Sequence, residues 1–177
     1  VANGAIAGLG NEAVTISDAN LLASSLNAVD AFTTGLVDAT AVTSITGTAA
    51  DINTAYTSNA AGTIHGLGNE VVIINDSSLS AAVLATIDAH TTGMVLAAQA
   101  TTIFGTYPEV FAVYTSQLNG TILGLGNEVI TITAPLTVAQ FNALSAQTTG
   151  FITATIIEGN IATLAAIAET GHALLIN

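Results

Sequence analysis

The chain has 177 residues, 12 acidic residues, no Lys or Arg, and a formal charge of −12. Because Lys and Arg make most protein contacts to phosphate, this composition argues against nucleic acid, anionic membrane surfaces and enzymes that handle nucleotides. The chain has no Cys, which excludes disulfides and thiolate metal sites. Polar residues interrupt every apolar run before it could span a bilayer, so no membrane insertion is predicted.

An internal repeat of 58 residues organises the chain. The pentapeptide Gly-Leu-Gly-Asn-Glu starts at Gly8, Gly66 and Gly124. The tripeptide Thr-Thr-Gly follows in each copy and ends at Gly35, Gly93 and Gly150. Self-similarity at this spacing is typical of repeat architectures. We therefore predict one repeat domain over residues 1–177, with units at approximately 5–62, 63–120 and 121–177.

The first half of each copy predicts a strand and a helix. Stretches rich in β-branched residues follow the pentapeptide and predict strands at 13–16, 71–74 and 129–132. Apolar pairs at i and i+3 then predict a helix that ends at the glycine of Thr-Thr-Gly. These pairs are Leu26 with Val29, Leu84 with Ile87, and Phe141 with Leu144. The candidate N-cap residues are Asp18, Ser80 and Thr137.

The second half of each copy repeats this order. Second strands are predicted at 37–45, 95–103 and 152–156. Capping-box spacing from Thr48 to Asp51, and from Thr106 to Glu109, predicts a second helix. Its buried stripe is formed by Ile52 with Tyr56 and by Val110 with Tyr114. The third copy diverges at 158–160, although Ile161, Leu164 and Ile167 keep helical spacing, and 172–177 resembles the first strand of another copy.

Strands that alternate with short helices favour parallel pairing through right-handed crossovers. We therefore predict an α/β solenoid of three 58-residue repeats, each with two strand-helix units and a parallel sheet. An all-β solenoid is the alternative, in which the short helical patterns are misinterpreted.

The acidic residues suggest one candidate metal site. The glutamates Glu12, Glu70 and Glu128 recur in register, and Asp18 and Asp76 follow shortly downstream. Carboxylate oxygens are ligands that Ca²⁺ prefers, so calcium is the one cofactor these residues suggest. Solvated turn acids and helix caps are the alternative interpretation, because neither calcium β-roll nor EF-hand spacing is present.

No catalytic residues are predicted. The pentapeptide resembles part of a dinucleotide-binding fingerprint, but a strand follows it where that fingerprint requires a helix, which favours a turn. The histidines His65, His90 and His172 occupy different positions of the repeat, and no Gly-x-Ser-x-Gly elbow exists. We therefore predict that the chain is not an enzyme.

Three segments carry a family resemblance: GLGNEAVTIS at 8–17, LNAVDAFTTG at 26–35 and SITGTAADINTAYTS at 44–58. They resemble repeats of very large secreted surface proteins of cyanobacteria and other Gram-negative bacteria. The resemblance implies an adhesin-like protein at the cell surface or outside the cell. It also implies neighbouring calcium-binding repeats and type I export without an N-terminal signal, and it brings no catalytic residues.

Neither end of the repeat pattern has an evident capping unit, and no Lys is present to discourage pairing at a strand edge. We predict that the ends stack head to tail through Val14, Ile16, Leu174 and Ile176. The chain would then be an extracellular subunit that assembles with copies of itself into a filament or surface matrix. The alternative is an adhesive, calcium-dependent module of a giant surface protein.

Overall fold

A computed structural model describes residues 10–167 and 175–176, and it is an α/β fold with parallel sheets. The helices are α1 (Ala23–Phe32), α2 (Ala49–Ala61), α3 (Ala81–His90), α4 (Tyr107–Asn119), α5 (Val138–Ser145) and α6 (Ile161–Leu164). The strands of the first half are β1 (Val14–Thr15), β2 (Asn20–Leu22), β3 (Val37–Asp38), β4 (Ser44–Gly47), β5 (Ile64–His65), β6 (Val71–Ile74) and β7 (Ser78–Ser80). Those of the second half are β8 (Val95–Leu96), β9 (Thr102–Gly105), β10 (Ile122–Leu123), β11 (Val129–Ile132), β12 (Ile152–Thr153), β13 (Thr155–Ile156) and β14 (Leu175–Ile176).

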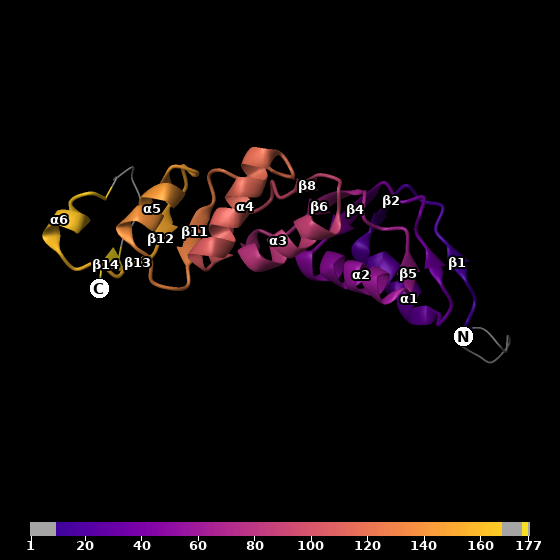
Figure 1. Cartoon of the computed structure of the whole chain (residues 1–177). Helices are drawn as coiled ribbons and strands as arrows, with labels where there is room; N and C mark the ends of the chain where they lie inside the picture. The colour runs from indigo at the N-terminus through magenta and orange to yellow at the C-terminus, as the bar shows by residue number, and fades with distance from the viewer. Residues whose placement is uncertain (1–9, 168–174, 177) are drawn as a thin grey trace.

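The molecule is elongated, and β1 and α6 lie at its opposite ends (Figure 1). Each strand pairs in parallel with a strand from the next stretch of chain, so that Val14 lies opposite Val37, and Val37 opposite Ile64. We call these successive stretches rungs: rung 1 (10–35), rung 2 (36–62), rung 3 (63–93), rung 4 (94–120), rung 5 (121–150) and rung 6 (151–167). Each copy of the sequence repeat therefore supplies two rungs.

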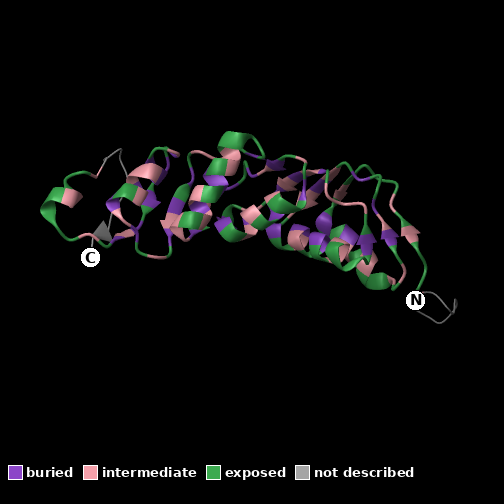
Figure 2. Cartoon of the chain, in the orientation of Figure 1, coloured by how far each residue is buried: buried purple, intermediate pink, exposed green. Residues whose placement is uncertain are grey.

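The core lies between the strands and the helices, along the length of the molecule (Figure 2). One column of inward side chains crosses four rungs and is fully buried; it consists of Ile45, Val72, Val95 and Ile122. Side chains alternate between the two faces of a strand, so β-branched residues at every second position form this continuous apolar column. Each buried Val or Ile side chain contributes about 1.5–3 kcal/mol relative to an exposed one.

Local sequence explains several helix boundaries. The hydroxyl of Thr48 accepts a hydrogen bond from Asp51 N at the start of α2 (3.1 Å), and Thr137 accepts one from Gln140 N at the start of α5 (3.2 Å). Both bonds satisfy backbone donors that lack a partner within the helix. At the other end of α2, Gly62 adopts a left-handed conformation with φ 83°. The predicted caps at Thr48 and Thr137 are confirmed.

Other expectations about the elements were wrong. The six helices of the described residues contradict the all-β alternative. The predicted strand at 37–45 divides into β3 and β4 because Val42 N donates to Ala39 O in an intervening turn (3.0 Å). Asp18 does not cap α1, which begins after Leu22, and Ser80 precedes α3 without a side-chain cap.

The strands β2, β5, β7 and β10 were not predicted, because runs of two or three residues carry too little alternation to be recognised. The predicted strands at 71–74 and 129–132 are confirmed as β6 and β11. Within the described part of the chain, no helix is both long and apolar enough to cross a bilayer.

Candidate functional site

The pentapeptide of the second copy forms a turn closed by its own glutamate. Glu70 is 0% exposed, and its Oε2 accepts hydrogen bonds from Gly68 N (2.7 Å) and Asn69 N (3.0 Å). Its Oε1 accepts a hydrogen bond from the hydroxyl of Tyr56, which α2 supplies from the preceding rung. Three donors therefore satisfy a buried carboxylate that has no Lys or Arg to pair with.

The third copy repeats this arrangement. Glu128 is buried and accepts hydrogen bonds from Gly126 N (2.8 Å) and from the hydroxyl of Tyr114 (2.8 Å). Burial raises the pKa of both phenols, and the hydrogen bond and negative charge of the neighbouring glutamate add to the rise. The neutral phenol is thus the favoured form, and it acts as a hydrogen-bond donor to the carboxylate.

The Thr-Thr-Gly tripeptide packs directly on this turn. The hydroxyl of Thr91 donates to Glu70 O (2.8 Å), and Thr92 N donates to Gly68 O (2.8 Å). Gly93 lies so close that a Cβ atom there would overlap the carbonyl oxygen of Glu70. The predicted role of this glycine as a helix end is wrong, because α3 already ends at His90. Close approach between two turns is what excludes a side chain at this position.

We call the cluster of Tyr56, Glu70 and Thr91–Gly93 the interior junction. It joins α2 of rung 2 to both ends of rung 3. His90 extends it, since its ring stacks on that of Tyr56 with centroids 5.3 Å apart. Each motif was recognised in the sequence, but the contact between them was not predicted. The signal was available as the constant separation of 14 residues between tyrosine and glutamate in two copies.

The same motifs form a different environment in rung 1, and we call Glu12 with Phe32–Gly35 the N-terminal junction. Thr33 still donates to Glu12 O (2.6 Å), and Gly10 N still donates to Glu12 Oε2 (2.6 Å). The side chain of Glu12 is exposed, and the Gly10 hydrogen bond lowers its carboxyl pKa. Phe32, which occupies the position of His90, is 84% exposed.

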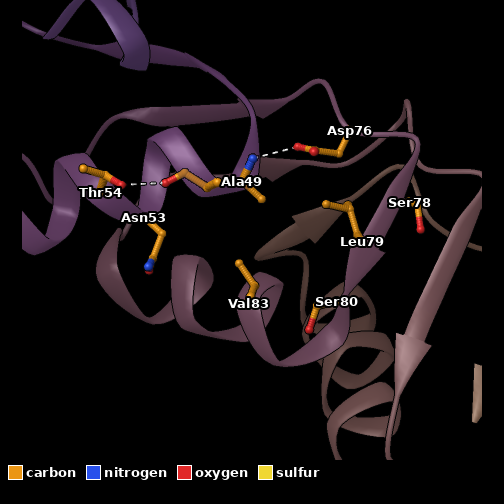
Figure 3. A pocket seen from close by; sticks show the side chains of 9 residues that line it. Ala49, Asn53, Thr54, Asp76, Ser78, Leu79, Ser80 and Val83 are labelled. Atoms are coloured by element: carbon orange, nitrogen blue, oxygen red, sulfur yellow. Dashed lines mark hydrogen bonds between the residues drawn. The ribbon is translucent and has the colours of Figure 1, made fainter. Parts of the chain in front are cut away.

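The five predicted calcium ligands have separate surroundings. The carboxylates of Glu70 and Glu128 accept hydrogen bonds within their own turns. Asp76 Oδ2 accepts a hydrogen bond from Ala49 N at the start of α2 (2.7 Å; Figure 3). Glu12 and Asp18 are exposed in rung 1. Over residues 10–167 and 175–176, no three acidic or histidine side chains gather as a metal-binding group. Calcium binding stays a prediction.

The four predicted interface residues lie at the two ends of the chain. Val14 and Ile16 of rung 1 are half-buried, whereas their equivalents Val72 and Ile74 are buried. Ile176 belongs to β14, which pairs with β13. Leu174 falls outside the described residues.

A groove runs between α2 and residues 76–83 of rung 3, and polar and apolar side chains, including Asp76, Leu79 and Val83, line it (Figure 3). The single carboxylate in it already caps α2, which gives the groove a role in packing. No family model, curated protein or solved structure matches this chain.

Proposed function

We propose that the chain is a non-enzymatic structural protein of the cell exterior, a solenoid of three 58-residue repeats that assembles head to tail into a filament or matrix. The observation that carries this proposal is the contrast between the ends and the interior. Phe32 and Ile161, the two most exposed large hydrophobic side chains of the described residues, lie in the first and last rungs. Exposed apolar side chains of this size favour association.

The strand ladders support the same proposal. Among the described strands, β1 pairs only with β3, and β2 pairs only with β4. Their outer edges therefore offer backbone donors and acceptors to a further strand, and no Lys is available to discourage this pairing. A contact between two different ends of a chain propagates into an open filament unless its rotation closes a ring.

The composition supports a location outside the cell. A chain without Lys or Arg offers no cleavage site to trypsin-like proteases. A formal charge of −12 also keeps separate copies apart at low ionic strength. Added salt screens this repulsion, because the Debye length falls to about 10 Å at 0.1 M.

The test is electron microscopy and sedimentation of the purified chain over a range of protein concentration, salt and calcium. Filaments or sheets that grow with concentration and salt are the expected result. Monomers under every condition would contradict self-assembly. Parallel samples with EGTA test whether assembly requires calcium, because chelation alone would then dissolve the polymer.

A second candidate function is an adhesive repeat module within a giant surface protein. One observation favours it: the interior junction and its equivalent at Glu128 each use a tyrosine, and no tyrosine follows Tyr114 in the sequence. The C-terminal rung of another copy would therefore leave Glu12 without a phenol. The unit that covers Glu12 would then be a neighbouring repeat of similar sequence.

A further inference from the structure

The surface of rung 1 contains an apolar groove, and α2 borders the corresponding surface of rung 3. Its lining consists of Ile16, Asp18, Leu21, Ser25, Leu26 and Val29. In rung 3 the equivalent positions include Asp76, Leu79 and Val83, which border α2 in Figure 3. The groove on rung 1 thus has the form of the surface on which α2 lies two rungs later.

Several contacts hold α2 on rung 3, and three of them involve rung 3 side chains that have equivalents in rung 1. Asp76 accepts the hydrogen bond of Ala49 N at the first turn of the helix, and Glu70 accepts that of the Tyr56 hydroxyl. His90 stacks on the ring of the same tyrosine. Between these points the helix buries Ile52 and Ala55 against the core. A charged cap, a phenol acceptor and an aromatic ring therefore fix the position of one helix.

Rung 1 has a side chain at each of the three equivalent positions. Asp18 stands where Asp76 does, Glu12 where Glu70 does, and Phe32 where His90 does. Each of these side chains is exposed. Rung 5 keeps only the glutamate, since Ala134 and Gln147 occupy the other two positions. Rung 1 is thus the closer match to the rung that binds α2.

We propose that rung 1 is a docking site for a tyrosine-bearing amphipathic helix of the α2 type, supplied by another repeat of similar sequence. Its tyrosine hydroxyl donates to Glu12, its ring stacks on Phe32, and its first backbone N–H groups face Asp18. The helix has the pattern shared by α2 and α4: Thr, then Asp or Glu three residues later, Ile or Val next, and Tyr eight residues after the Thr.

The tyrosines of a second copy do not meet this requirement. Tyr56 and Tyr114 are buried in interior junctions, and Tyr107 lies in the first turn of α4. The inference rests on the proposed function in one respect: both use the surface of rung 1 as the contact surface. The two differ in what binds rung 1. Head-to-tail assembly places the C-terminal rung of another copy there, whereas the inference places a helix there.

The test extends the full chain with the helix it is inferred to bind. Residues 1–4 align with 59–62, so a copy of residues 48–58 is joined directly before Val1, which places its tyrosine two residues before the chain. Amide hydrogen exchange in rung 1 should slow by about tenfold or more, and the melting temperature should rise by several degrees. A scrambled 11-residue extension is the matched control.

Two substitutions separate specific docking from general stabilisation. Glu12→Gln should remove much of the added protection in the extended chain and change the parent chain little. Replacing the appended tyrosine by phenylalanine should have a similar effect, and the two changes together should be less than additive. Equal protection from the helix and its scrambled control would overturn the inference, as would a gain that ignores both substitutions.

Sedimentation of the parent chain keeps this inference separate from the proposed function. If the parent chain forms filaments and the extended chain stays monomeric, the helix covers the surface used in assembly, which supports the inference. If the parent chain stays monomeric, head-to-tail assembly fails while the exchange data on the extended chain still decide the docking site. If rung 1 of the parent chain becomes protected at high concentration as strongly as by the helix, the occupant is another copy.

Discussion

Rung 1 and rung 3 carry the same motifs in different surroundings. In rung 3 the glutamate of the pentapeptide is buried under a tyrosine from the preceding rung, whereas Glu12 in rung 1 is exposed. Leu79 is buried in rung 3, and its equivalent Leu21 is half-buried. Two rungs are therefore needed to complete a junction, and one copy of the motif specifies only part of it.

The largest difference in stability between rung 3 and rung 1 variants should come from the glycine that contacts the pentapeptide turn. Gly93→Ala would force a Cβ atom into Glu70 O and separate two turns in the interior, at a cost of about 4 kcal/mol. Gly35→Ala makes the same overlap with Glu12 O, but only the terminal rung should open. Urea unfolding followed by circular dichroism and by hydrogen exchange would distinguish the two. Gly159→Ala, with no atom near its Cβ, is the control.

Cavity formation should give the next largest difference. Leu79→Ala removes a side chain from the core and should lower the free energy of unfolding by about 3 kcal/mol. Leu21→Ala should cost about 1 kcal/mol, because its side chain keeps part of its contact with solvent. Equal losses in urea denaturation would show that rung 1 is covered as fully as rung 3.

Substitutions of Glu70 and Glu12 should differ less in their effect on the free energy of unfolding. Glu70→Gln replaces one acceptor oxygen by an NH₂ group among hydrogen-bond donors, and we expect a loss of about 2 kcal/mol. Glu12→Gln should change stability by less than about 0.5 kcal/mol, since its side chain is exposed. The same denaturation measurement checks both variants, and a large loss for Glu12→Gln would contradict the open N-terminal junction.

The smallest effect concerns the phenol and its pH dependence. Tyr56→Phe should cost about 1 kcal/mol at neutral pH, because Glu70 keeps its two backbone donors. Burial raises the pKa of Tyr56 in the folded chain, so the neutral phenol stabilises the fold fully below the ordinary pKa of about 10 and this stability falls as the pH rises further.

Tyr56→Phe should therefore lose less stability than the parent chain between about pH 9 and 11.5. Urea midpoints measured across this range test the prediction. Parallel pH curves for the two proteins would show that Tyr56 does not contribute to alkaline unfolding.

Much of the local structure could be predicted from the sequence. The β-branched runs at 71–74 and 129–132 and the cap at Thr48 are local signals, and the structure confirms them. The interior junction was not predicted, because Thr91 and Glu70 meet only after the chain has passed through two strands and a helix. The hydrogen bond from the Tyr56 hydroxyl to Glu70 was also not predicted, although the same separation of 14 residues recurs between Tyr114 and Glu128.

The repeat, the lack of Lys and Arg, the strands β6 and β11 and the caps at Thr48 and Thr137 follow from residue type and spacing along one chain. The burial of Glu70 and Glu128 but not of Glu12, and the need for glycine at 93 beside a neighbouring turn, are visible only in the folded chain. The physical reason is that burial and close approach depend on the adjacent rung. Identical pentapeptides therefore form a closed junction in rung 3 and an exposed one in rung 1.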